Sequence, residues 1–227
     1  QSAKTLIVAD RLVHASIIDG MTLSKSPFTR FRHNDLTHLR RILEKEASCY
    51  EQVLVIVESV YSMDGDRADI DGLAEIKRDH PNVLLYVDEA HAFGVEGIHG
   101  LGMCRSSKCY DDIDIMVGTF GKACASMGAF CAVSAPLKDY LVNRSRSLIF
   151  STALPPMTAA WTRFMIERFL DMDAEREHLK VLGERLQSIL STMSPDFPIT
   201  ASHIQPLVVG DPKRAVALSA KLLDYGF

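Results

Sequence analysis

Short apolar runs alternate with stretches of helical periodicity along most of the chain. Continuous apolar runs are typical of strands that a sheet buries on both faces. Five such runs predict strands, at residues 5–9, 53–58, 83–87, 114–118 and 129–133. Helices are predicted between them, at residues 15–23, 35–47 and 70–80. Asp35 or Asn34 is expected to cap the second helix. The order of these elements predicts an α/β fold with a mostly parallel sheet and helices on both faces.

The last third of the chain has a different pattern. Helical spacing extends over residues 156–190 with an interruption near 171–174. A strand is expected at 203–209 and a further helix at 212–225. We therefore predict a large domain at residues 1–170, followed at 171–227 by the start of a smaller α/β domain.

Composition and charge restrict the class of protein. Of the 227 residues, 47% are hydrophobic and 24% are charged, which is ordinary for a globular protein with a sizeable core. The net charge of −4 gives no electrostatic reason to expect nucleic acid or an anionic membrane as a partner. No apolar run reaches the 18 or so residues of a membrane span. The five cysteines show no CxxC spacing and are interpreted as free thiols, so we expect a cytoplasmic protein.

Polar groups stand where two of the predicted strands end. Asp88 follows the run 83–87, with His91 three residues later, and Lys122 follows the run 114–118 in a turn of small residues that suggests a crowded site. The carboxyl ends of parallel strands meet at one edge of a sheet, where α/β proteins bind ligands. A lysine near a carboxylate and a histidine suits a cofactor bound as a Schiff base.

Five motifs, in order, resemble those of the α-oxoamine synthases, fold-type I enzymes that depend on pyridoxal 5′-phosphate (PLP). The motifs are HASIIDG at 14–20, HND at 33–35, SMDG at 62–65, DEAH at 88–91 followed by Gly94, and GTFGK at 118–122. The resemblance covers nearly the whole chain. It implies the PLP-binding large domain and part of the small domain of that fold. It also implies a homodimer, because the segment at 151–156 is similar to one at the family's subunit boundary.

The resemblance also implies roles for individual residues. Lys122 would carry the cofactor and, once displaced, remove the α-proton of the substrate, and His14 would stack on the cofactor ring. Asp88 would pair with the pyridinium nitrogen. His91 would donate a hydrogen bond to the phenolic oxygen.

Four further residues complete the expectations for the site. Ser62 would contact the phenolic oxygen and Thr119 the phosphate. Glu58 ends a buried strand toward the edge of the site and receives no chemical role. The segment around His33 is interpreted as a helix cap, and no metal site is predicted.

The implied reaction joins an amino acid to an acyl thioester, on CoA or an acyl carrier protein, with loss of CO₂ to give an aminoketone. The segments 118–122, 151–156 and 204–211 most resemble family members that join L-alanine to a pimeloyl thioester in biotin synthesis. The segment 125–130 resembles bacterial serine palmitoyltransferases, and the segment 14–20 resembles 2-amino-3-ketobutyrate CoA ligase, so these activities remain alternatives.

Two other classes of protein share features of this sequence. DEAH also occurs in helicases, but that interpretation requires a GxxxxGK[ST] phosphate loop, which this sequence lacks. A non-catalytic fragment or subunit is the second alternative, against which Lys122 argues. The family's glycine-rich phosphate turn and its carboxylate-binding arginine have no counterparts in this sequence. We therefore expect a fragment of a longer enzyme.

Overall fold

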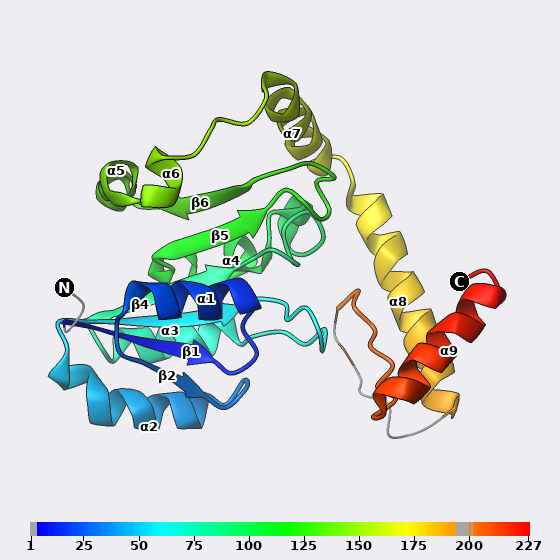
Figure 1. The fold of residues 1–227 in the computed structure, drawn as a ribbon, viewed down its shortest axis with the longest axis horizontal. Coiled ribbons are helices and arrows are strands. Elements are labelled where there is room, and N and C mark those ends of the chain that lie inside the picture. Colours follow the sequence, from blue (N-terminus) through cyan, green and yellow to red (C-terminus); the bar gives the residue numbers. More distant parts are fainter. Residues whose placement is uncertain (1–3, 194–199, 201) are drawn as a thin grey trace.

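One six-stranded sheet forms the centre of the protein (Figure 1). The computed structural model describes residues 4–193, 200 and 202–227. The strands are β1 (Thr5–Asp10), β2 (Phe28–Phe31), β3 (Gln52–Glu58), β4 (Val83–Asp88), β5 (Ile115–Thr119) and β6 (Ala129–Val133). They are ordered β2-β1-β3-β4-β5-β6, and only the β5–β6 pair is antiparallel. The prediction of a mostly parallel sheet is confirmed.

Helices cover both faces of the sheet. The helix α1 (Ala15–Ser24) packs on one face, against Ile7 and Ile56, and lies in front of the sheet in Figure 1. The helices α2 (Leu36–Glu46) and α3 (Ile70–Arg78) pack on the opposite face. Side chains alternate along a strand, so neighbouring apolar residues of β1 supply both cores.

The remaining helices follow the fourth strand. They are α4 (Met103–Ser106), α5 (Ala135–Arg144), α6 (Arg146–Ile149), α7 (Pro156–Phe169), α8 (Asp173–Met193) and α9 (Pro212–Asp224). Short 3₁₀ turns occur at Ala47–Cys49, Ile98–Gly100 and Tyr110–Asp112. Figure 1 shows α8 and α9 beside the sheet rather than on it. In the ranges that the structure describes, no helix has both the length and the apolar character needed to cross a membrane.

Side-chain caps determine where two of the helices begin. The Asp35 carboxylate accepts a hydrogen bond from the backbone N–H of His38 at 2.8 Å. The Asp69 carboxylate accepts one from the backbone N–H of Gly72 at 2.9 Å. Each cap satisfies a backbone donor that the first turn of a helix leaves free. Of the two residues expected to cap α2, Asp35 is the one that does so.

The strand predicted at 203–209 is wrong. Residues 202–210 contain no regular secondary structure. A strand needs a neighbour to pair its backbone groups. Among the described residues, no strand pairs with this segment. Hydrogen bonds from side chains hold it instead. The Ser202 hydroxyl donates to the Gly65 carbonyl at 2.6 Å, and the Thr200 hydroxyl donates to the Ile204 carbonyl at 2.8 Å. The domain boundary near residue 170 stays a prediction.

Replacing Leu85 with alanine is expected to lower the free energy of unfolding by about 2–5 kcal/mol, because the change removes a packed side chain and leaves a cavity. Leu85 is 1% exposed, in the core between the sheet and the helices α2 and α3. Urea unfolding measures the loss. The matched control is Leu23→Ala on α1, where the leucine is 81% exposed and the expected change is within about 0.5 kcal/mol. Equal effects of the two substitutions would contradict this placement of the core.

Candidate active site

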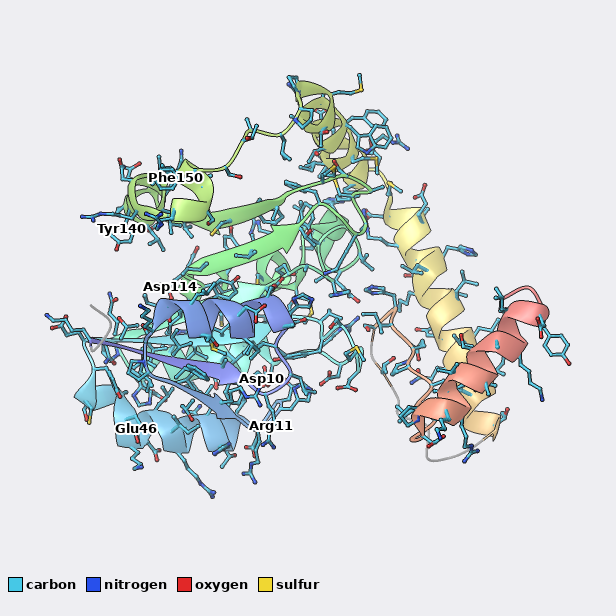
Figure 2. All side chains as sticks on the ribbon, viewed as in Figure 1. Asp10, Arg11, Glu46, Asp114, Tyr140 and Phe150 are labelled. Carbon is cyan, nitrogen blue, oxygen red and sulfur yellow. The ribbon has the colours of Figure 1, made fainter. Side chains whose placement is uncertain are left out.

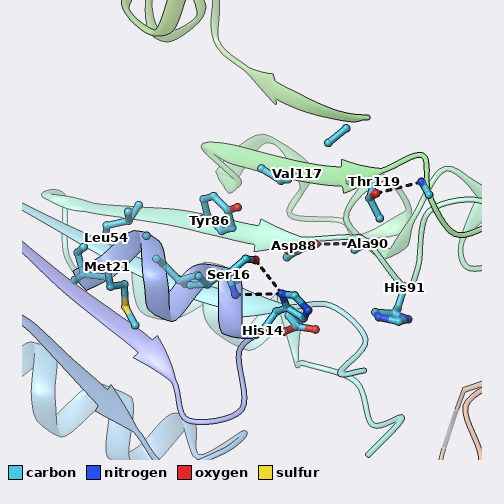
Figure 3. A pocket seen from close by; sticks show the side chains of 18 of the residues that line it. His14, Ser16, Met21, Leu54, Tyr86, Asp88, Ala90, His91, Val117 and Thr119 are labelled. Atoms are coloured by element: carbon cyan, nitrogen blue, oxygen red, sulfur yellow. Dashed lines mark hydrogen bonds between the residues drawn. The ribbon is translucent and has the colours of Figure 1, made fainter. Parts of the chain in front are cut away.

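A cavity of about 640 Å³ lies between α1 and the carboxyl ends of the central strands (Figure 3). Five of the six residues predicted for the site line it, and these are His14, Asp88, His91, Thr119 and Lys122. They come from the start of α1 and from the ends of β4 and β5. The parallel strands therefore bring together residues that are up to about a hundred positions apart in the sequence, as expected for this edge of an α/β sheet.

Ser62 is the predicted site residue that does not line the cavity. It is half-buried in the loop after β3, and its backbone N–H contributes to holding the Glu58 carboxylate. Glu58 itself lines the cavity and is only 2% exposed. The sequence contained one signal for it, a carboxylate at the end of an otherwise apolar strand.

Asp88 lies at the end of β4. Its Oδ1 accepts a hydrogen bond from the backbone N–H of Ala90 at 2.8 Å. Burial raises the pKa of Asp88, while the Ala90 hydrogen bond and the charge of Lys122 oppose this rise. The carboxyl group is thus oriented by the backbone and lies close to a positive charge.

His91 is held in its neutral form. Burial, together with the positive charge of Lys122, lowers its pKa to about 4. A neutral imidazole has one N–H donor and one acceptor. At physiological pH this ring can donate a hydrogen bond to an oxygen in the cavity.

Lys122 projects from a tight turn after β5. The Lys122 carbonyl accepts from the backbone N–H of Ala125 at 2.9 Å, and Ser126 closes the turn by donating its N–H to the Phe120 carbonyl at 2.8 Å. Lys122 is exposed in this structure, so the crowded setting expected from its small neighbours is not observed. Burial of part of the side chain still lowers its pKa, although Asp88 and Glu58 act in the opposite direction.

An aromatic cluster anchors the lysine turn. Cys124 is fully buried against Phe93 and Phe169, and Phe120 and Phe130 pack around them. The rings of Phe93 and Phe130 meet edge-on, with centroids 4.8 Å apart.

A glycine is required where the turn meets the segment after His91. Gly94 has φ +89°, and a Cβ there would lie 2.7 Å from the Cβ of Ala123. This contact fixes the lysine turn against the segment that follows β4.

One hydroxyl group and one imidazole group complete the cavity wall. The Thr119 hydroxyl accepts from the Gly121 N–H at 3.2 Å and donates to the Gly128 carbonyl at 3.3 Å. His14 caps α1, with its Nδ1 accepting from the backbone N–H of Ser16 at 3.2 Å, and its ring is exposed at the cavity. Figure 3 shows His14 opposite the strand ends that carry Asp88 and Thr119.

A second polar cluster lies outside the cavity, at the end of β1. His33 Nδ1 is 2.8 Å from Asp10 Oδ1, and His33 Nε2 is 2.7 Å from Asp66 Oδ2. His33, Asp64 and Asp66 bring possible metal-ligand atoms within 4.8 Å of one another. Because both ring nitrogens of His33 already face carboxylates, the arrangement is explained by a protonated histidine between two acids.

The His33 cluster is expected to make the stability of the fold depend on pH. Burial disfavours the charged ring, but the hydrogen bonds and charges of Asp10 and Asp66 outweigh it and raise the pKa of His33. The stabilisation that the charged His33 gives is therefore fully present below pH 6.5, the ordinary pKa of histidine. It is lost as the pH rises through the raised pKa of His33. We expect His33→Gln to lower the free energy of unfolding by about 1.5–3 kcal/mol at pH 5.5, and by less at pH 8.5.

Urea unfolding at a series of pH values measures this difference between the two proteins. His178→Gln serves as the control, since His178 is exposed on α8. A constant difference between the unfolding free energies of the His33→Gln variant and the unaltered protein, from pH 5.5 to 8.5, would rule out the charged histidine.

Comparison with known proteins finds relatives along the whole chain. Residues 1–227 match the family described as aminotransferase class I and II. A putative 8-amino-7-oxononanoate synthase of Pasteurella multocida is 48% identical over 225 residues, covering 99% of this chain and 58% of that protein. An 8-amino-7-oxononanoate synthase of Haemophilus ducreyi is 46% identical over 226 residues, covering 98% of this chain and 58% of that protein. The chain thus spans about three-fifths of the length of the curated relatives it matches.

Solved structures share the fold over nearly all of the chain. A serine palmitoyltransferase from S. paucimobilis, with a bound PLP–myriocin aldimine, superposes with a TM-score of 0.90 at 28% identity. The match covers 99% of this chain and 58% of that one. An 8-amino-7-oxononanoate synthase from Francisella tularensis superposes with a TM-score of 0.84 at 28% identity, over 99% of this chain and 64% of that one.

Proposed function

The chain belongs to the aminotransferase class I and II family, and on this premise we propose that it forms the cofactor-binding part of a PLP-dependent α-oxoamine synthase. The cavity between α1 and the strand ends would hold PLP. The observation that supports this most directly is the meeting of Asp88, His91 and Lys122 at one cavity, from separate strand ends.

The chemistry of the lining residues fits this cofactor. Asp88 offers a backbone-oriented carboxylate to the pyridinium nitrogen, and the neutral ring of His91 offers an N–H to the phenolic oxygen. The Thr119 hydroxyl would reach the phosphate by exchanging its 3.3 Å hydrogen bond to the Gly128 carbonyl. Bound PLP supplies an aldehyde for amines and a ring that withdraws electrons from the α-carbon of the substrate.

Lys122 has two roles in this proposal. Its amine would hold the cofactor covalently until substrate enters. When free, the amine would accept the α-proton of the amino acid at Nζ. A lowered pKa keeps more of this amine neutral and able to accept a proton. His14, at the start of α1, would cover the face of the cofactor ring.

We further propose that the reaction joins L-alanine to a pimeloyl thioester, on CoA or an acyl carrier protein, with loss of CO₂. The curated relatives, at 46–48% identity, are named for the aminoketone product of the biotin pathway. Serine palmitoyltransferase is the second candidate, because its solved structure superposes with a TM-score of 0.90. 2-Amino-3-ketobutyrate CoA ligase remains a third, on the motif at 14–20. Aminoketone formation from alanine with pimeloyl-CoA, or from serine with palmitoyl-CoA, distinguishes the first two.

Exposed apolar side chains support the proposal of a homodimer. They gather on α5 to α7 and the connections between them, and Figure 2 labels two of them, Tyr140 on α5 and Phe150 at the end of α6. Trp161 is also 45% exposed on α7. The five cysteines are unpaired, which supports a cytoplasmic location.

The cofactor proposal is tested by mixing the chain with PLP, reducing with borohydride and locating the label by peptide mass spectrometry. Label on Lys122 is the expected result. A folded chain with no label, or with the label spread evenly over its lysines, would overturn the proposal. Circular dichroism on the same sample establishes that the chain is folded.

A further inference from the structure

We propose that the buried carboxyl group of Glu58 is a positioning group of this site, which holds His14 at the start of α1 and leaves Asp88 as the charged acid beside it. The inference rests on the proposed PLP site. It assigns a function to a residue for which the family motifs provided none. Three observations carry it: the strand register, the hydrogen bond to His14 and the charges that face Glu58.

The strand register places the two carboxyl groups side by side. Glu58 and Asp88 are Cα partners at the ends of the parallel strands β3 and β4. Partner residues on neighbouring strands point to the same face of a sheet, and such strands lie about 4.8 Å apart. Both side chains accordingly line the same cavity. Neighbouring carboxylates repel each other, which favours a proton on one of them.

A hydrogen bond connects Glu58 to the helix that carries His14. Glu58 Oε1 accepts from the backbone N–H of His14, a residue 44 positions earlier in the chain. His14 is the N-cap of α1, and its own ring accepts from Ser16. Glu58 therefore joins the end of β3 to the start of α1. Loss of its carboxyl group would release the residue expected to cover the cofactor.

The charges around Glu58 determine which of the two acids is ionised. Burial, followed by the negative charge of Asp88, raises the pKa of Glu58 to about 7. The groups that face it from neighbouring elements are the Asp88 carboxylate, the Lys122 ammonium, the backbone N–H groups of His14 and Ser62, and the neutral phenols of Tyr61 and Tyr86. Asp88 is half-buried and more accessible than Glu58, which is 2% exposed. As the pH falls below about 7, Glu58 is therefore the acid that takes up the proton, while Asp88 carries the charge.

Cofactor binding then has a consequence that can be measured. A pyridinium paired with Asp88 would cancel the negative charge that, after burial, raises the pKa of Glu58. The pKa of Glu58 would then fall, and a proton would be released. By linkage, a ligand whose binding releases a proton binds more tightly as the pH rises through that range. Each unit by which the cofactor lowers this pKa gives up to about tenfold in affinity.

Two substitutions separate the positioning role of Glu58 from the titration of its carboxyl group. Glu58→Gln retains an oxygen that can accept from His14 but does not titrate, whereas Glu58→Ala removes both functions. Glu51→Gln is the matched control, because Glu51 is 64% exposed just before β3. The measurements are the Kd for PLP from pH 5.5 to 8.5 and the number of protons released on binding in weakly buffered solution. Borohydride labelling of Lys122 accompanies them.

We expect Glu58→Gln to bind PLP within about twofold of the unaltered chain at pH 5.5 and several-fold more weakly at pH 8.5. It should also release fewer protons near pH 7. Glu58→Ala should bind at least tenfold more weakly at every pH. Equal affinities and equal proton release for the unaltered chain and Glu58→Gln across the range would overturn the inference, even if the alanine variant does not fold. Absence of label on Lys122 in the unaltered chain would instead overturn the proposed function.

Discussion

Lys122→Ala is expected to abolish covalent attachment of PLP and to leave the fold intact. Among the lysines in the described part of the chain, Lys122 is the one that lines the cavity. Alanine has no amine to form the Schiff base, so borohydride-fixed label should fall to background. Because Lys122 is exposed, the free energy of unfolding should change by no more than about 0.5 kcal/mol.

The measurement combines peptide mass spectrometry with urea unfolding. Lys45→Ala is the control, since the Lys45 side chain is 81% exposed on α2, and it should retain full labelling. Label that persists in Lys122→Ala would remove Lys122 from the site. A parallel loss of label and of folded protein would show that the residue acts through stability.

Asp88→Asn is the second substitution with a large expected effect. The asparagine preserves the shape of the side chain but cannot neutralise a pyridinium. Loss of a charged hydrogen bond costs about 1.5–3 kcal/mol, which corresponds to a loss of PLP affinity of roughly tenfold to a hundredfold. Removal of α-protons should fall further, because an unprotonated ring withdraws electrons poorly.

The stability of the Asp88→Asn variant should not fall. The substitution removes a charge that burial at the end of β4 disfavours. Exchange of the α-proton of L-alanine in D₂O, followed by NMR, measures the chemical effect, and urea unfolding measures the stability. Asp19→Asn, at an exposed position on α1, is the control. Unchanged α-proton exchange in Asp88→Asn would exclude the ion pair with the cofactor.

The elements that could be predicted are those whose burial requires a recognisable apolar pattern in the sequence. The strand β3 is apolar along nearly its whole length because both faces of the sheet are covered there. The strand β2 was not predicted, since its four residues FTRF lie at the edge of the sheet and are mostly accessible. The strand at 203–209 was predicted wrongly for a different reason. An apolar run in the sequence does not reveal whether a neighbouring strand is present to pair with it.

The same distinction applies to the candidate site. Asp88, His91 and Lys122 could be anticipated because they follow strands, and the ends of parallel strands meet. The family resemblance that these motifs carried is confirmed by the matched family and by the named relatives. The position of the Ser62 side chain depends on the path of a loop, which no pattern in the sequence determines. Glu58 was left without a role because its proximity to Asp88 depends on the strand register.

The walls of the cavity come from residues that lie between positions 7 and 129 of the chain. Contacts of such long sequence separation form late in folding, after the strands that carry them have paired. An intact pocket therefore does not exist in early, partly folded states, and PLP has nothing to bind there. By stabilising the finished structure alone, the cofactor would slow unfolding and leave the rate of folding nearly unchanged. Its presence would lengthen the lifetime of the native protein without guiding its formation.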